Sequence, residues 1–170
     1  MRLGLLGGSF NPIHRCHLSI ARSARQLLQL DRVLFIPTGD PPHKQPGTLA
    51  AASHRHRMVQ LAIQDTPEFA LTDIEIQRSG KSYSIDTVRA IQQEYGPDTV
   101  LFFIIGLDAF LDLPSWKEAD TLLKSCHFVV ISRPSTSFQA MACSPVRGVS
   151  ARGTEGSKNA RTWPSQTGRL

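Results

Sequence analysis

Residues 3–17 read LGLLGGSFNPIHRCH, an apolar run that stops at two glycines and continues to two histidines. The apolar residues at 3–6 predict a first strand, which Gly7 and Gly8 end. Apolar residues then return at helical spacing and predict a helix over about 15–30: Ile20, Ala24, Leu27 and Leu28. A strand, a glycine turn and a helix in this order are typical of an open α/β sheet, which binds ligands at the carboxyl ends of its strands.

The remainder of residues 1–134 repeats this alternation. We expect further strands at 33–36, 69–77, 100–105 and 127–131, helices at about 53–64, 84–94 and 116–124, and a loop rich in proline and glycine over 38–47. Ser53 and Ser84 are the expected N-caps of two helices, with Met58, Leu61 and Ala62 facing inward from the first. Strand 100–105 is the most apolar and is expected at the sheet centre. The predicted fold class is α/β, a Rossmann-like open parallel sheet with helices on both faces.

The composition narrows the class of protein. The chain has 170 residues, 41% of them hydrophobic and 19% charged, which fits one globular domain. It has no apolar run of the roughly 20 residues that a membrane span needs, and no signal-peptide pattern. We therefore expect a cytoplasmic protein without a membrane partner. Three cysteines without paired spacing, Cys16, Cys126 and Cys143, argue against a disulfide framework.

Residues 135–170 differ in character from the rest. Most of the net charge of +5 lies here, as five basic residues against Glu155 alone: Arg147, Arg152, Lys158, Arg161 and Arg169. The segment has one leucine and no isoleucine, too little apolar surface to offset the entropy of ordering. We interpret it as a disordered tail or an out-of-frame sequence, so that the domain over 1–134 is incomplete. Nucleic-acid binding by the tail is an alternative, but the tail lacks interleaved aromatic residues, and we expect no nucleic-acid partner.

The two histidines of the opening stretch are the strongest candidates for chemistry. His14 and His17 are three positions apart, so on the first helical turn they can face the same side. There the helix N-terminus favours an anion, and imidazoles can donate hydrogen bonds to a phosphate. One alternative is a pair of surface histidines; another is a metal held by His14, Cys16 and His17, although Cys16 is expected to face away from both. His54 and His56, with the arginines beside them, indicate a solvated helix start.

Taken with the motifs that follow it, this stretch resembles a known family. It matches the GGxFxPxHxxH signature of the nucleotidyltransferases, and the chain is most similar to bacterial nicotinate-nucleotide adenylyltransferases. Five motifs stand in that family's order over about 1–134: IPT at 36–38, PPHK at 41–44, SYSIDT at 82–87, IGLD at 105–108 and PSW at 114–116.

The resemblance implies transfer of AMP from ATP to nicotinate mononucleotide, giving deamido-NAD and pyrophosphate, with Mg²⁺ accompanying the ATP. It implies three catalytic residues, His14, His17 and Lys44. The implied ATP-binding residues are His14 and His17 with Gly7, Gly8, Ser9, Phe10, Gly106 and Asp108. Those implied for nicotinate mononucleotide are Thr38, His43, Lys44, Tyr83, Ser84, Thr87 and Trp116. No metal ligand from the protein is implied.

Several alternatives stay open. Lys44 can be a solvated loop lysine, Asp108 a helix N-cap and Trp116 a core residue. Members of the family continue past the Arg-Pro pair at 133–134 with a strand and a helix bearing a Ser/Thr-x-x-x-x-Arg motif, which this chain lacks in context. The chain can therefore be a weakly active or inactive nucleotide-binding protein. Pantetheine-phosphate and nicotinamide-mononucleotide adenylyltransferases share the first motif, and no oligomeric state is predicted.

Overall fold

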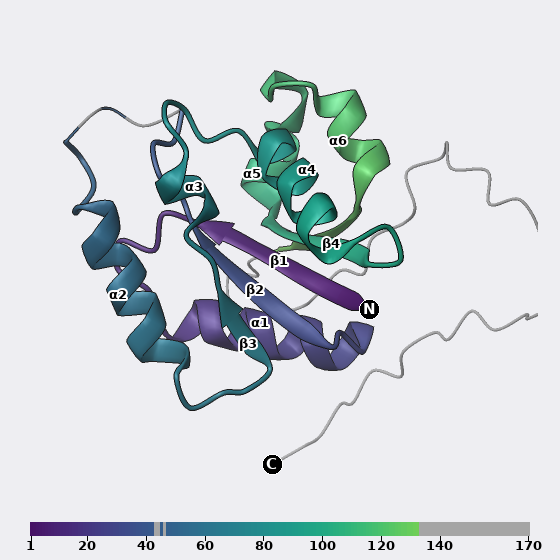
Figure 1. Cartoon of the computed structure of the whole chain (residues 1–170), viewed down its shortest axis with the longest axis horizontal. Helices are drawn as coiled ribbons and strands as arrows, with labels where there is room; N and C mark the ends of the chain where they lie inside the picture. Colours follow the sequence, from purple (N-terminus) through teal and green to yellow (C-terminus); the bar gives the residue numbers. More distant parts are fainter. Residues whose placement is uncertain (43–44, 46, 133–170) are drawn as a thin grey trace, which may run out of the picture.

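The strands form one parallel sheet. The computed structural model describes residues 1–42, 45 and 47–132. Within them lie five strands, of which Figure 1 labels the first four: β1 (Arg2–Gly8), β2 (Arg32–Pro37), β3 (Phe69–Leu71), β4 (Val100–Gly106) and β5 (His127–Ile131). All neighbours pair in parallel, in the order β3-β2-β1-β4-β5. The segment 135–170, interpreted above as a disordered tail or an out-of-frame sequence, lies outside the described residues.

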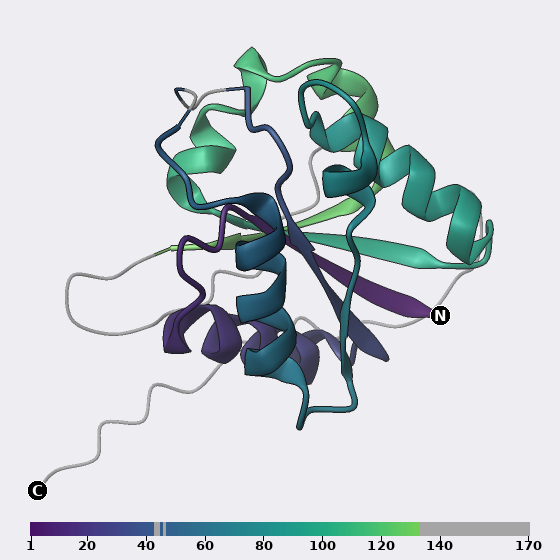
Figure 2. The ribbon, with the colours of Figure 1, turned by 60° about the vertical axis from the view of Figure 1, so that its left-hand side comes forward.

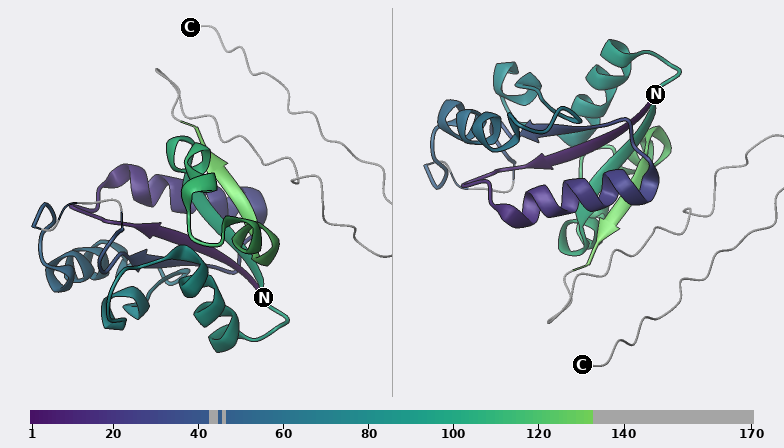
Figure 3. Two further views of the ribbon diagram at one scale, coloured as in Figure 1. Left: turned by 90° about the horizontal axis from the view of Figure 1, so that it is seen from above. Right: turned by 90° about the horizontal axis from the view of Figure 1, so that it is seen from below.

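Helices lie on both sides of this sheet. They are α1 (Arg15–Leu28), α2 (Ala52–Ile63), α3 (Ile74–Gln77), α4 (Ser84–Tyr95), α5 (Leu107–Leu111), the 3-10 turn η1 (Leu113–Ser115) and α6 (Ala119–Ser125). In Figure 3, α1 lies against one face of the sheet and α4 against the opposite face. Figure 2 shows the same separation, with the purple α1 below the sheet and the teal α4 above it. The predicted α/β class is confirmed.

Two apolar layers hold the helices to the sheet. One layer joins alternate strand residues, among them Leu5 and Phe103, to Val88 of α4 and Leu122 of α6. The other joins the residues of the opposite face to α1 and α2, through Ala21, Ala24, Val59 and Ile63. Because successive side chains of a strand point to opposite faces, each inner strand is apolar along its whole length. These layers fix where the strand ends lie and hence where a ligand can bind.

The central position of the sheet belongs to β1. It pairs with β2 on one side and β4 on the other, so the prediction that 100–105 forms the centre is wrong by one strand. Five of the seven residues of β4 are nonetheless buried, as expected for a strand covered on both faces. The chain leaves β1 in one direction toward β2 and returns on the other side of β1 as β4. This reversal creates a switch point between β1 and β4, where open α/β sheets bind ligands.

The segment 69–77, predicted as one strand, divides into β3 and α3. The backbone N–H of Thr72 donates to the carbonyl of Phe35 at 3.1 Å, the last tie to β2. Asp73 then precedes the helix, and the N–H groups of Ile76 and Gln77 both bond its carbonyl. Asp is a common residue at helix starts because its side chain competes with strand hydrogen bonds. The short helix that results directs Glu75 into the interior, where it is 8% exposed.

Three further details of the helices differ from the prediction. The N-cap of α2 is Ala51 and that of α4 is Tyr83, so neither Ser53 nor Ser84 caps its helix. The inward face of α2 consists of Arg55, Val59 and Ile63, one residue in every four, whereas Leu61 is 49% exposed. The segment 116–124 is helical only from Ala119, because Trp116 and Lys117 belong to the connection after η1. Within the described residues, no helix has the length and apolar character needed to cross a membrane.

Candidate functional site

A cleft of about 770 Å³ opens at the switch point of the sheet. Its floor is formed by the ends of β1 and β4, including Gly7, Gly8, Ile105 and Gly106. Volumes of about 300–1,000 Å³ are typical of clefts that hold small ligands. Residues from the β1–α1 loop line one end, and residues around the start of α4 and after η1 line the other. One cleft thus brings together segments that are about 100 positions apart in the chain.

Phe10 supports the histidine end of the cleft from beneath. Its φ of 44° lies in the left-handed region, and its ring is only 2% exposed. The ring meets His17 edge-on, with centroids 5.0 Å apart, and lies 5.9 Å from the ring of Phe35. A left-handed aromatic residue is uncommon and persists only where packing holds it. The Phe10 ring is thus packed against His17, and the predicted role of Phe10 in binding ATP stays a prediction.

His14 and His17 lie one against the other at the start of α1. Their ring centroids are 3.8 Å apart with an interplanar angle of 30°. The backbone N–H of His14 donates to Nδ1 of His17 at 3.2 Å, and the N–H of His17 donates to the His14 carbonyl at 3.0 Å. Because Nδ1 of His17 accepts a hydrogen bond, the neutral ring carries its proton on Nε2. That leaves Nε2–H as the hydrogen-bond donor of His17.

Cys16 does not face away from the histidines. It lines the same cleft as His14 and His17, so the prediction about its direction is wrong. Cys16 and Ile20, one turn apart on α1, line the cleft together with the two histidines. Among the described residues, however, no group of three His, Cys, Asp or Glu side chains is arranged to hold a metal. Cys16 is exposed, whereas burial raises the pKa of the Cys126 thiol to about 12.

As far as the described residues show, the opposite end of the cleft is aromatic and carries one cation. Tyr83, Ser84, Trp116 and Lys117 line it. The Trp116 ring packs edge-on against Phe103, with centroids 6.4 Å apart, and remains partly exposed. Nζ of Lys117 lies 4.8 Å from the centre of the Tyr83 ring. Nζ of Lys117 also forms a salt bridge with Oδ2 of Asp86 at 2.9 Å, so its charge is paired within the protein. The aromatic surface is therefore the feature of this end that suits a flat ring.

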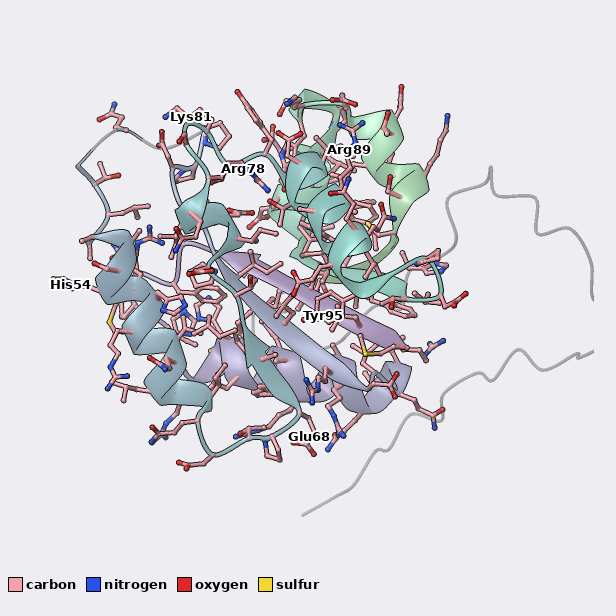
Figure 4. All side chains as sticks on the ribbon, in the orientation of Figure 1. His54, Glu68, Arg78, Lys81, Arg89 and Tyr95 are labelled. Carbon is pink, nitrogen blue, oxygen red and sulfur yellow. The ribbon has the colours of Figure 1, made fainter. Side chains whose placement is uncertain are left out.

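A buried polar network lies behind this aromatic end. The Thr87 hydroxyl, 1% exposed, donates to Oε1 of Glu75 at 2.9 Å and in turn accepts from Nη1 of Arg78 at 3.0 Å. Figure 4 shows Arg78 reaching from the connection after α3 toward α4. Thr87 and Glu75 both line the cleft, and the Thr87 hydroxyl is also part of this network. The predicted role of Thr87 in binding nicotinate mononucleotide stays a prediction. Sequence reasoning missed Glu75 and Arg78, because the segment that holds Glu75 was predicted as a strand.

The carboxyl of Glu75 is expected to make the stability of the fold depend on pH. Burial raises its pKa, although hydrogen bonds from Thr87 and Ser82 and the charge of Arg78 act in the opposite direction. The folded state then binds a proton more tightly than the unfolded state does, so the free energy of unfolding falls as the pH rises through the raised pKa. Glu75→Gln mimics the protonated form and should remove this fall. Urea unfolding of both proteins from about pH 4 to about pH 8 measures the difference.

The matched control for this titration is Glu68→Gln. Glu68 lies at the opposite end of the molecule from Arg78 in Figure 4, where it is partly exposed and paired with Arg25 at 3.3 Å. The control alters the net charge as the Glu75 variant does. Wild type should lose stability relative to Glu75→Gln as the pH rises, and not relative to Glu68→Gln. Parallel pH profiles for wild type and Glu75→Gln would contradict the prediction.

The structure gathers most of the predicted site residues around one cleft. The lining residues are Gly7, Gly8, Ser9, His14, His17, Thr38, Tyr83, Ser84, Thr87, Gly106 and Trp116. Asp108 is exposed in the first turn of α5, beside Gly106. The N-cap of α5 is Gly106, so the alternative that Asp108 caps this helix is wrong. The predicted residues His43 and Lys44 lie outside the described residues, between Pro42 and Gln45.

The fold and the cleft together define the class of protein: an open parallel α/β protein with its ligand site at the strand switch point. A family model of cytidylyltransferase-like proteins matches residues 5–154. The chain belongs to this cytidylyltransferase-like family.

Individual relatives carry a more specific name than the family does. A probable nicotinate-nucleotide adenylyltransferase of Citrifermentans bemidjiense is 50% identical over 143 residues, which are 84% of this chain and 65% of the relative. One of Moorella thermoacetica is 45% identical over 133 residues, which are 78% of this chain and 61% of the relative. The chain therefore spans slightly less than two thirds of the length of these relatives.

Solved structures agree on the fold. The Plasmodium falciparum nicotinic acid mononucleotide adenylyltransferase complexed with NaAD superimposes with a TM-score of 0.69 at 23% identity, covering 81% of this chain and 67% of that one. The same enzyme complexed with APC gives a TM-score of 0.65 at 22% identity, with the same coverage of the two chains. At this identity the likeness supports the α/β architecture alone.

Proposed function

We propose that this protein transfers the adenylyl group of ATP to nicotinate mononucleotide and releases deamido-NAD and pyrophosphate. The observation that carries the proposal is that a pair of histidine donors and an aromatic wall face each other across one cleft. The first is suited to phosphates and the second to a flat pyridine ring. The names of the relatives, which are 45–50% identical over the aligned 133–143 residues, support the same reaction.

The reaction needs positioned donors more than covalent chemistry. The acceptor phosphate attacks the α-phosphorus of ATP, the bond to the bridging oxygen breaks, and pyrophosphate leaves. Negative charge builds on the α-phosphate oxygens during this step. We propose that Nε2–H of His17 and the amide groups of the β1–α1 loop, which lines the cleft, donate hydrogen bonds to that charge. The packing of Phe10 against His17 holds the donor in place before the substrate arrives.

The remaining roles are proposals of the same kind. We propose that Mg²⁺ enters with ATP and shields the leaving pyrophosphate. Lys44 is proposed to add a cation at the phosphates, His43 and Thr38 to face the acceptor, and Asp108 to bind the ribose hydroxyls of ATP. We place the reaction in the cytoplasm, where ATP is available.

Incubation with ATP, Mg²⁺ and one acceptor at a time tests the proposal. Pyrophosphate release is followed with nicotinate mononucleotide, nicotinamide mononucleotide and phosphopantetheine. We expect kcat/KM to be highest with nicotinate mononucleotide. Turnover only with phosphopantetheine would replace the proposed substrate. If calorimetry detected ATP binding but no acceptor supported turnover, the protein would be a nucleotide-binding protein without this activity.

Trp116→Ala is expected to raise KM for nicotinate mononucleotide by about 5- to 100-fold while leaving KM for ATP within about twofold. Stacking of a flat ring on an aromatic side chain contributes about 1–3 kcal/mol. Trp116→Phe keeps an aromatic surface and should recover most of the affinity. Leu111→Ala, at a side chain that is 69% exposed on the neighbouring α5, is the control for a change of apolar surface. An equal rise of both KM values in Trp116→Ala would identify Trp116 as a core residue instead.

A further inference from the structure

Arg55 is the largest of the fully buried side chains in the described part of the protein, with 1% of its surface exposed. It was expected to be part of a solvated helix start. Its neighbour His54 does lie at the outer edge of α2 in Figure 4, but Arg55 points from the same turn into the interior. Burial lowers the pKa of its guanidinium group. A buried cation of this kind calls for a physical explanation, because removing a charge from water is costly.

The partners of Arg55 are three backbone carbonyls. Nε donates to the carbonyl of Ala50 at 2.9 Å, Nη1 to that of Ser9 at 2.8 Å, and Nη2 to that of Gly39 at 3.3 Å. Among the described residues no carboxylate forms a salt bridge with it. The planar fork of a guanidinium group can bind several acceptors in fixed directions, which the single ammonium group of lysine cannot do.

These carbonyls belong to the two loops that form neighbouring edges of the cleft. Ser9 is in the β1–α1 loop, which leads to His14 and His17. Gly39 and Ala50 are near the two ends of the β2–α2 connection, which also supplies Thr38 to the cleft. Arg55 is thus bonded to both loops at once, at positions 46 and 16 residues before it in the chain.

Two hydrogen bonds between neutral groups join the same part of the structure. The N–H of Thr38 donates to the Gly8 carbonyl at 2.9 Å. The N–H of Ala50 donates to Oδ1 of Asn11 at 3.1 Å, and that bond is exposed to solvent. A solvent-exposed hydrogen bond is worth less than one made by a charged, buried donor. Of the ties between the two loops, those of Arg55 are therefore the ones expected to set their separation.

We propose that Arg55 is a positioning residue that braces the phosphate-facing β1–α1 loop against the β2–α2 connection and so sets the geometry of the adenylyl-transfer cleft. The kinetic part of this proposal rests on the proposed function. Arg55 itself does not contact substrate. Its fork keeps His17 and the residues around Thr38 at a fixed separation, so its loss should disturb alignment of the two substrates more than the affinity of either one.

The kinetic test compares Arg55→Lys and Arg55→Met with Val59→Ala. Val59 is fully buried one turn further along α2, so its truncation reports a loss of packing on the same helix face. We expect kcat to fall about 10- to 100-fold in both Arg55 variants, with smaller changes in KM, because small misplacements near a reacting centre have effects of this size. Val59→Ala should keep kcat within about threefold of wild type at a matched loss of thermal stability. Wild-type kcat in Arg55→Lys would overturn the proposal, since charge alone would then suffice.

Amide hydrogen exchange tests the brace without relying on any activity. The N–H groups of His14, Thr38 and Ala50 are hydrogen-bonded in the two loops and report on their opening. Arg55→Lys should speed exchange at all three by at least about tenfold, whereas Val59→Ala should not single them out. Equal exchange in Arg55→Lys and wild type would overturn the brace whether or not the protein turns over nicotinate mononucleotide.

If the Arg55 variants fail to fold, amide hydrogen exchange in the wild-type protein tests the proposal. Loops that share one brace should open together, so His14, Thr38 and Ala50 should exchange with the same opening free energy and the same dependence on denaturant. Independent opening of His14 from Thr38 and Ala50 would overturn the proposal. Failure of the proposed function, by contrast, would appear as absent turnover with this shared opening intact.

Discussion

His17→Ala is expected to lower kcat for the proposed adenylyl transfer by about 10²- to 10³-fold, with a smaller change in KM for ATP. Loss of one preorganised donor to a developing oxyanion has effects of this size. The geometry identifies Nε2 as that donor, because Nδ1 accepts the backbone N–H of His14. Steady-state kinetics with nicotinate mononucleotide and Mg·ATP measure the loss, and thermal unfolding checks that the fold is retained.

His54→Ala is the matched control for His17→Ala. His54 is exposed on the outer side of α2, away from the cleft lining, so its loss should leave kcat within about twofold of wild type. His17→Gln retains a donor on a side chain of different shape and should recover part of the loss. A fall in KM and kcat by equal factors in His17→Ala, or an unchanged kcat, would remove His17 from the proposed transition-state contacts.

Gly39→Ala is expected to have the largest effect on the fold. A Cβ atom at Gly39 would overlap the carbonyl oxygen of Glu75 and lie 2.9 Å from its carbonyl carbon and 3.1 Å from Oγ of Ser82. Two of these atoms are backbone and cannot rotate away. Since overpacking of this kind costs about 1–3 kcal/mol or more, we expect the melting temperature to fall by roughly 4–12 °C. Separation of the loop from α3 should also lower activity, because Arg55 is bonded to the Gly39 carbonyl.

Two other glycines serve as controls for Gly39→Ala. At Gly4 the nearest atom to a new Cβ is Cδ1 of Leu30, at 2.8 Å, and this flexible side chain can shift. At Gly7 no atom lies within 4 Å, and the residue lines the cleft. Gly4→Ala should therefore cost less stability than Gly39→Ala, and Gly7→Ala should leave the melting temperature unchanged while raising KM for ATP. Equal stability of the Gly39 and Gly7 variants would contradict the close approach to Glu75.

The strands were the most predictable part of the fold. Strand 127–131 was predicted with its observed bounds, and 100–105 with an error of one residue. Both are runs of apolar residues between polar ends, a pattern that depends only on neighbours in the chain. The segment 69–77 was wrong because its alternation of apolar and polar residues continues beyond the point at which Thr72 and Asp73 begin a helical turn.

The inward face of α2 could not be predicted from hydrophobicity. Apolar residues at Met58, Leu61 and Ala62 suggested one face. Ala62 does pack against the core, but the buried residues are Arg55, Val59 and Ile63. The reason is that Arg55 is buried by its bonds to carbonyls of other segments, and no local pattern reveals such partners. Glu75 was missed for a similar reason, since its burial depends on Thr87 and on the close approach of Gly39.

The stretch at 3–17 by itself determined a strand, a glycine turn and a helix that presents two histidines at its start, because each of these features depends on residues a few positions apart. It also indicated a phosphate-binding function through donors at the end of a strand. Only the tertiary structure decided that Phe10 supports His17, that Cys16 faces the cleft, and that Arg55 joins two loops. These properties arise from contacts between segments that are distant in the chain, and such contacts exist only once the sheet has brought those segments together.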